Sequence, residues 1–180
     1  MANKLGAWRE HTYCEPFAEA LAEDKAFRIW VLQRAGLGDF SMSARCLREE
    51  QRVKRPGAMF WWKDYYCHES RCNCDGLAGR QIDILAIFQD SMDRTVGLHI
   101  ECKHPKDRFK NSAQARGYKK RALCWGPEGL QPNTVLSHGE AVTVLLCDRN
   151  HRHIDADLAA FDTVLYFDEI GERISGYPPS

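Results

Sequence analysis

Hydrophobic and polar residues are arranged as strands in two segments near the middle of the chain. Residues 81–88 form an apolar run that we expect to be a buried strand, bounded by Gly79 and Asp90. From Thr95 to Lys103 the alternation is strict, and side chains of a strand point alternately to its two faces. This pattern predicts an apolar face made of Val96, Leu98, Ile100 and Cys102, opposite a face that carries Thr95, Gly97, His99, Glu101 and Lys103.

The rest of the pattern predicts further helices and strands. Pro16 favours the first turn of a helix and Gly36 its end, so we expect the first helix at 16–34. The other expected elements are helices at 43–54 and 111–124, a helical turn at 158–161, and strands at 141–147 and 163–167, the last near a sheet edge. This order predicts an α/β sandwich with a mixed central β-sheet flanked by helices.

Length and composition narrow the class of protein. The 180 residues predict a single domain over 1–180, with a Cys-rich loop at 67–76 and a C-terminal tail that frays after Gly176. With 25 basic and 25 acidic residues the net charge is zero, which argues against a surface that binds nucleic acid all over but allows a local basic face. Neither a membrane-spanning run nor the apolar core of a signal peptide is evident, so we expect a cytoplasmic protein with reduced cysteines and no membrane partner.

The candidate chemistry lies on the two central strands. Asp83 interrupts the first apolar run, and Glu101 and Lys103 lie two residues apart on the polar face of the second. Two carboxylates and a lysine at neighbouring strand ends can hold a hard divalent cation and position a water molecule beside it. These residues therefore predict hydrolysis of phosphodiester bonds.

Asp83 followed by Glu101-Cys102-Lys103 resembles the PD-(D/E)xK nuclease superfamily, and Gln114 with Tyr118 resembles the Gln-x-x-x-Tyr helix of its RecB-like members. The resemblance covers about residues 16–147 and implies a restriction-endonuclease-like core. It implies that Asp83 and Glu101 bind Mg²⁺ or Mn²⁺ with the main-chain carbonyl of Cys102, and that Lys103 assists the attacking water. One departure is Ile82, which stands where the family motif has proline.

The segment after Lys103 is basic, and it leads into the predicted helix at 111–124. We expect Gln114 to position Lys103, water or phosphate, and Tyr118 to support contact with the nucleic-acid backbone. The basic residues are expected to bind phosphate, with a solvated helical face as the alternative. They are Lys106, Arg108, Lys110, Arg116, Lys119 and Lys120.

Three further features allow two interpretations each. Asp24 is either an extra acidic residue that the first helix supplies to the site or a capping or surface charge. The aromatic run at 59–66 either stacks on unpaired bases or fills the core. Cys67, Cys72 and Cys74 either bind a structural Zn²⁺ with a remote ligand or are free thiols in a hairpin loop.

Together these features predict a Mg²⁺-dependent nuclease. We expect its nucleic-acid substrate to be DNA. A homodimer would suit cleavage of both strands. The alternative is a nuclease-like module that has no catalytic activity and binds nucleic acid or a protein, with or without structural zinc. The sequence leaves open whether the substrate is a single strand, an end, a junction or a duplex site.

Overall fold

A mixed β-sheet of five strands forms the centre of the computed structural model, which describes residues 4–67, 81–105, 107, 109, 112–150 and 155–179. The strand order is β1-β4-β5-β6-β7, with β1 antiparallel to β4, β4 antiparallel to β5, and β5, β6 and β7 parallel to one another. The predicted mixed sheet is thereby confirmed. The strands are β1 (Arg45–Cys46), β4 (Ile84–Gln89), β5 (Thr95–Lys103), β6 (Glu140–Cys147) and β7 (Thr163–Tyr166).

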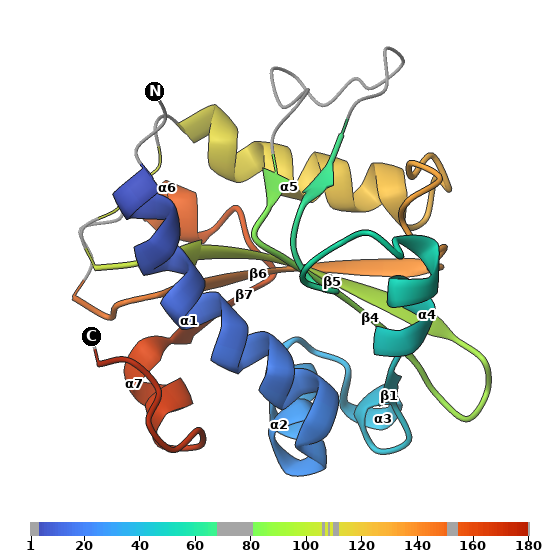
Figure 1. The fold of residues 1–180 in the computed structure, drawn as a ribbon, viewed down its shortest axis with the longest axis horizontal. Helices are drawn as coiled ribbons and strands as arrows, with labels where there is room; N and C mark the ends of the chain where they lie inside the picture. Colours follow the sequence, from blue (N-terminus) through green and yellow to red (C-terminus); the bar gives the residue numbers. More distant parts are fainter. Residues whose placement is uncertain are drawn as a thin grey trace.

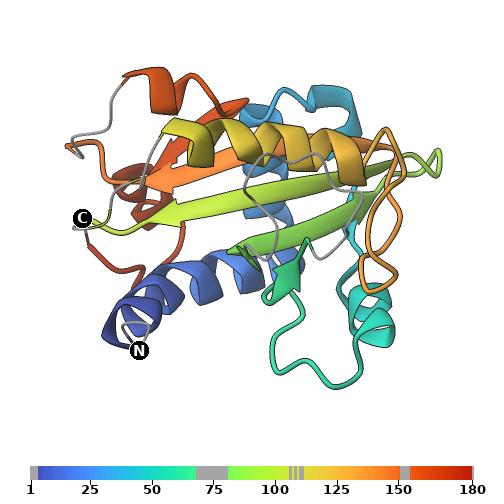
Figure 2. The ribbon, with the colours of Figure 1, turned by 90° about the horizontal axis from the view of Figure 1, so that it is seen from above.

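Helices cover both faces of this sheet (Figure 1). One face is covered by α5 (Ser112–Trp125), which lies over the strands in Figure 2, together with the short α6 (Asp155–Leu158). The other face packs against α1 (Lys4–Glu23), α2 (Lys25–Arg34) and α7 (Phe167–Gly171). The remaining elements are α3 (Gly38–Ser41), α4 (Arg48–Lys54) and a separate two-stranded sheet of β2 (Tyr65–Tyr66) and β3 (Gln81–Ile82).

Strand β5 has the bounds and the facing that its alternation predicts. Its four apolar side chains from Val96 to Cys102 are buried in the core that includes Phe17 and Leu21 of α1. The predicted strand at 81–88 is instead divided at Asp83, because β3 pairs with β2 whereas β4 pairs with β5. Asp83 therefore lies where the chain passes from the small sheet to the large one.

The N-terminal helical segment begins earlier than predicted and is divided in two, whereas its end at Arg34 is confirmed. It begins at Lys4 and continues through Pro16, and a second helix follows it. The break falls at Asp24, whose Oδ1 accepts hydrogen bonds from the main-chain N–H groups of Ala26 (2.8 Å) and Phe27 (3.0 Å). Asp24 is thus the N-cap of α2, a position at which a carboxylate stabilises a helix.

Two other segments also depart from expectation. The first part of the predicted helix at 43–54 is strand β1, because Arg45 and Cys46 pair with Gln89 and Phe88 and extend the sheet beyond β4. The prediction that the C-terminal tail frays is wrong for the part that the structure describes. Tyr177 is only 7% exposed, and its hydroxyl donates to the main-chain carbonyl of Tyr13 at 3.1 Å.

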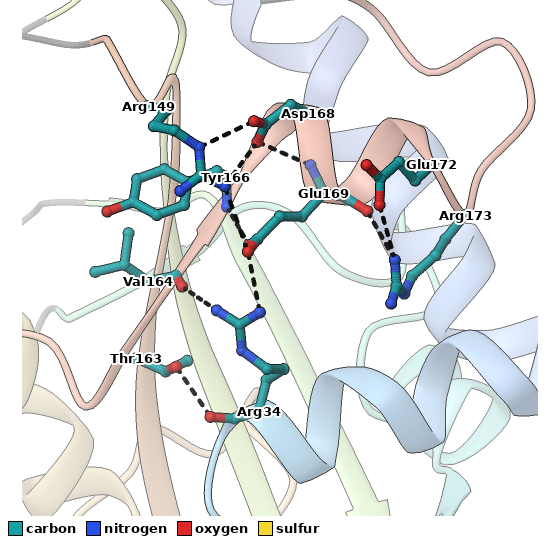
Figure 3. A network of polar contacts seen from close by, with 9 residues as sticks. All are labelled: Arg34, Arg149, Thr163, Val164, Tyr166, Asp168, Glu169, Glu172 and Arg173. Carbon is teal, nitrogen blue, oxygen red and sulfur yellow. Dashed lines mark hydrogen bonds and ion pairs between the residues drawn. The ribbon is translucent and has the colours of Figure 1, made fainter.

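A network of polar contacts connects the β7 edge of the sheet with α2 and α7 (Figure 3). The guanidinium of Arg34, at the end of α2, lies 3.2 Å from Glu169 Oε1 and donates to the carbonyl of Val164 at 3.3 Å. The hydroxyl of Thr163 donates to the carbonyl of Arg34 at 3.0 Å. These contacts join α2, β7 and α7.

Within the described residues, no helix combines the length and hydrophobicity needed to cross a membrane.

Candidate active site

The sheet brings Asp83 and Glu101 to the same point. The last pair of the β4–β5 ladder is Ile84 with Ile100, so the next position along each strand sets Asp83 level with Glu101. The main-chain N–H of Cys102 donates to Asp83 Oδ2 at 2.8 Å, which holds the carboxyl group against β5. Two residues that are 18 positions apart in sequence thus become neighbours through antiparallel pairing.

Lys103 points along the same face as Glu101, as the alternation of β5 predicts. Its ammonium nitrogen lies 2.5 Å from Glu101 Oε1 and 3.2 Å from Asp107 Oδ2, and it lies 5.0 Å from the centre of the Phe109 ring. Glu101 and Lys103 are only 2% and 5% exposed. Polar groups this deeply buried need partners, and each supplies one for the other.

Helix α5 supplies two further partners to Glu101. Gln114 and Tyr118 lie one turn apart on the same helix face. The side-chain amide of Gln114 lies 3.4 Å from Glu101 Oε1, and the Tyr118 hydroxyl donates to Oε2. Both residues were expected near the site, but we expected Tyr118 to contact nucleic acid. Tyr118 is buried and positions Glu101 instead.

A carboxyl group that the sequence analysis missed also lies at this site. Glu10 on α1 is hydrogen-bonded to Asp83. It is also close enough to Glu101 and Lys103 for their charges to affect its pKa. The first helix therefore does supply an acidic residue, but it is Glu10 and not Asp24. The signal was the buried stripe of Cys14, Phe17 and Leu21, which reaches Glu10 when it is continued by one turn.

The carboxyl groups affect one another's protonation. Burial and the neighbouring Glu10 raise the pKa of Asp83 to about 8. Burial and then Asp83 raise the pKa of Glu101 well above its ordinary value, against the opposite effect of Lys103. Burial also raises the pKa of Glu10. The site therefore concentrates negative charge that it cannot fully accommodate without a cation or a proton.

The pKa of Lys103 is also raised, which for an ammonium group favours the charged form. Burial alone would lower the pKa of its ammonium group, but Glu101 and Asp83 outweigh burial and raise the pKa above its ordinary value. Lys103 is consequently a fixed positive charge and a hydrogen-bond donor at neutral pH. It is not a group that accepts a proton.

The donor set fits a hard divalent cation. Among the described residues, no three or more His, Cys, Asp or Glu side chains are grouped so that they could hold a metal ion together. Magnesium, however, usually needs only one or two carboxylates and takes its other ligands from water and substrate phosphates. Asp83, Glu101 and the main-chain carbonyl of Cys102 offer the oxygen atoms that such a site requires. A cation there would also relieve the repulsion between the carboxylates.

The predicted phosphate-binding residues fall into two groups. Arg116, Lys119 and Lys120 are exposed on α5, although Lys119 Nζ lies 2.5 Å from Asp162 Oδ1 and is already paired. The other three predicted residues, Lys106, Arg108 and Lys110, lie outside the described part of the chain.

The aromatic run mainly fills the core. Trp61, Trp62 and Tyr65 are buried, which favours packing over base stacking for these three side chains. Of the predicted zinc ligands, Cys67 is buried and packs in a cluster with Trp125, whereas Cys72 and Cys74 lie outside the described residues. Structural zinc stays a prediction.

Comparisons with protein families, with curated protein sequences and with solved structures find no match to this chain. Its function is therefore inferred from the chemistry of the site.

Proposed function

We propose that this protein is a Mg²⁺- or Mn²⁺-dependent nuclease that hydrolyses phosphodiester bonds in DNA. The observation that carries the proposal is that Asp83, which lies 18 residues before Glu101 in sequence, converges with Glu101 and Lys103 in one site, where Glu101 and Lys103 are buried. We further propose that the mixed sheet and the helices on its two faces form a restriction-endonuclease-like core.

Asp83, Glu101 and the carbonyl of Cys102 would hold the cation. A divalent cation bound there would lower the pKa of a coordinated water molecule and neutralise charge on the phosphate. Glu10 adds a third carboxyl group beside Asp83, and it would strengthen the attraction for a cation. A bound cation would account for the closeness of these three acidic residues, of which Glu101 is buried and Asp83 and Glu10 are partly buried.

The other residues orient the reacting groups. The ammonium of Lys103 would donate a hydrogen bond to the attacking water or to a phosphate oxygen, and its positive charge would offset the charge that develops on phosphorus. Gln114 and Tyr118 hold the Glu101 carboxylate in place. Arg116 and Lys120, exposed on the same helix, would contact flanking phosphates.

The proposal is tested by a cleavage assay on supercoiled, linear and single-stranded DNA in Mg²⁺, Mn²⁺ or EDTA. The wild type is compared with Asp83→Asn and Lys103→Ala, and with Lys25→Ala as a control, because Lys25 is exposed at the start of α2. We expect metal-dependent cleavage that falls by at least about 100-fold in both site variants and is unchanged in the control.

Circular dichroism of each variant would show that the fold is retained. A folded wild-type protein that cleaves none of the DNA forms in either metal would overturn the proposal. It would favour the alternative of a nuclease-like binding module.

A further inference from the structure

The ammonium group of Lys103 contacts two carboxylates that differ in burial. Its nitrogen lies 2.5 Å from Glu101 Oε1 and 3.2 Å from Asp107 Oδ2. The side chain of Glu101 is 2% exposed, whereas that of Asp107 is 38% exposed. Asp107 therefore offers Lys103 a second partner, which is nearer to solvent than the carboxylate in the proposed metal site.

A turn directly after β5 places Asp107 beside Lys103. The main-chain N–H of Asp107 donates to the carbonyl of His104 at 2.8 Å, which is the bond that closes a four-residue turn. Pro105 occupies the second position of this turn, where its fixed φ angle is favourable. The chain thus returns to the ammonium group four residues after Lys103. The ring of Phe109, whose centre lies 5.0 Å from the same nitrogen, also favours a cation there.

Glu101 has partners from the chain at both of its carboxylate oxygens. Oε1 is contacted by Lys103 and by the side-chain amide of Gln114 at 3.4 Å, and Oε2 accepts from the hydroxyl of Tyr118. Gln114 and Tyr118 are neutral, so both can stay beside a carboxylate that also contacts a divalent cation. Lys103 is positively charged, and like charges at such short distances repel each other strongly in a buried site. The contact between Lys103 and Glu101 is therefore the one that a cation in the proposed site would weaken most.

We propose that Asp107 is a positioning residue, which holds the ammonium group of Lys103 while Glu101 binds the divalent cation. Without Asp107, Lys103 would keep its contact with Glu101, because a buried ammonium group needs a partner. It would then compete with the cation for the same carboxylate. This inference rests on the proposed nuclease function, and it deepens that function by adding a residue that lies outside the Glu101-Cys102-Lys103 motif.

The test measures Mn²⁺ binding by calorimetric titration, which does not depend on cleavage. The proteins are the wild type, Asp107→Asn, Lys103→Ala and the variant that carries both substitutions. Asp39→Asn is the matched control, because Asp39 is exposed and lies beside Val96, near the opposite end of β5 from Lys103. Circular dichroism of each variant checks that the fold is retained.

We expect Asp107→Asn to weaken Mn²⁺ binding by about 10-fold, at the lower end of the effects of residues that position groups at a metal site. In the Lys103→Ala background the same substitution should change the affinity by less than about 2-fold, because no ammonium group is left to compete. Asp39→Asn should leave the affinity unchanged. Asp107→Glu, which keeps a carboxylate, should bind Mn²⁺ more tightly than Asp107→Asn does.

Cleavage of DNA at saturating Mn²⁺ gives a second readout. The kcat of Asp107→Asn should fall by about 10-fold, because Lys103 is no longer held where it assists the attacking water. Its KM for DNA should not rise, because the substitution removes a negative charge and leaves the attraction for phosphate intact. Asp107→Glu should recover part of the lost kcat.

The inference and the proposed function fail in different ways. An Asp107→Asn protein that binds Mn²⁺ like the control would overturn the role of Asp107, whether or not the wild type cleaves DNA. A loss of affinity that persists in the Lys103→Ala background would also overturn it, because Asp107 would then attract the cation directly. A wild type that cleaves no DNA but shows the expected coupling in Mn²⁺ binding would overturn the nuclease function and support the role of Asp107.

Discussion

The ammonium nitrogen of Lys103 lies 2.5 Å from Glu101 Oε1, inside the group of carboxyls that we propose as the metal site. Lys103 therefore neutralises the same carboxylate that a divalent cation would bind. The two cations compete electrostatically for Glu101, although both are needed for the proposed reaction. Lys103 should therefore be required for cleavage but should not be required for metal binding.

We predict that Lys103→Ala abolishes cleavage but still binds a divalent cation at least as tightly as the wild type. In the absence of metal the variant should lose about 3 kcal/mol of stability, because a buried carboxylate is left without its partner. Its melting temperature should then rise more in Mn²⁺ than that of the wild type. Calorimetric titration with Mn²⁺ checks the affinity directly, and a variant that no longer binds Mn²⁺ would show that Lys103 supports the metal site.

We also predict that stabilisation by Mg²⁺ depends on pH. The pKa of Asp83 is raised to about 8, so between about pH 4 and pH 8 the folded protein binds a proton that the unfolded chain has released. Without metal, the free energy of unfolding should therefore fall as pH rises through this window. At pH 8.5 the cation replaces the proton, and saturating Mg²⁺ should raise the melting temperature by about 5–10 °C.

At pH 5.5 the same Mg²⁺ concentration should raise the melting temperature by less than about 2 °C, because protons occupy the carboxyl groups. Asp83→Asn serves as the control, since an uncharged amide of the same size should remove most of the metal effect at both pH values. A Mg²⁺ effect that is the same at pH 5.5 and pH 8.5 would contradict the assignment of these carboxyls as the ligands.

The sequence predicted the part of the site that lies on strands better than the part that lies on helices. Strict alternation from Thr95 to Lys103 determines both the bounds of β5 and the face on which Glu101 and Lys103 lie. A helix has no comparable internal marker of where it starts. Pro16 suggested a beginning that the real helix passes through, so residues before it were not placed on a helix face.

Tertiary contacts decided what the local pattern could not. Cys46 lies in a segment of helical composition, yet pairing with Phe88 makes it part of a strand. Tyr177 lies in a segment rich in glycine and proline, yet it is held by packing against the core and by its bond to Tyr13. Both depend on residues distant in sequence, which no short window of the chain reveals.

Glu10 and Asp24 give a direct test of which acidic residue of the first two helices matters for catalysis. We predict that Glu10→Gln lowers cleavage by at least about 10-fold, because Glu10 contacts Asp83. Asp24→Ala should leave cleavage unchanged and lower stability by about 1 kcal/mol, the usual cost of removing an N-cap. Cleavage rates and urea denaturation measure the two effects, and loss of cleavage in Asp24→Ala with normal activity in Glu10→Gln would reverse the assignment.

The polar face of β5 continues beyond Glu101 to a pair of buried histidines. The Nδ1–H group of His138 donates to the carbonyl of Leu136 at 3.0 Å, which leaves His138 Nε2 to accept a hydrogen bond from His99 Nε2 at 3.2 Å. Burial lowers the pKa of both rings, so the pair is neutral at pH 7. This pair fixes the His138 ring over Gly97, where a Cβ atom would lie 2.6 Å from two ring atoms.

We predict that Gly97→Ala destabilises the protein by about 1–3 kcal/mol, because the held ring cannot move away from the added methyl group. In a His138→Ala background the same substitution should be neutral or stabilising, since alanine loses less conformational entropy in a strand than glycine does. Urea denaturation of the four proteins in this double-mutant cycle gives the coupling energy between the two sites. A Gly97→Ala cost that is the same in both backgrounds would show that the His138 ring is not what excludes a side chain at position 97.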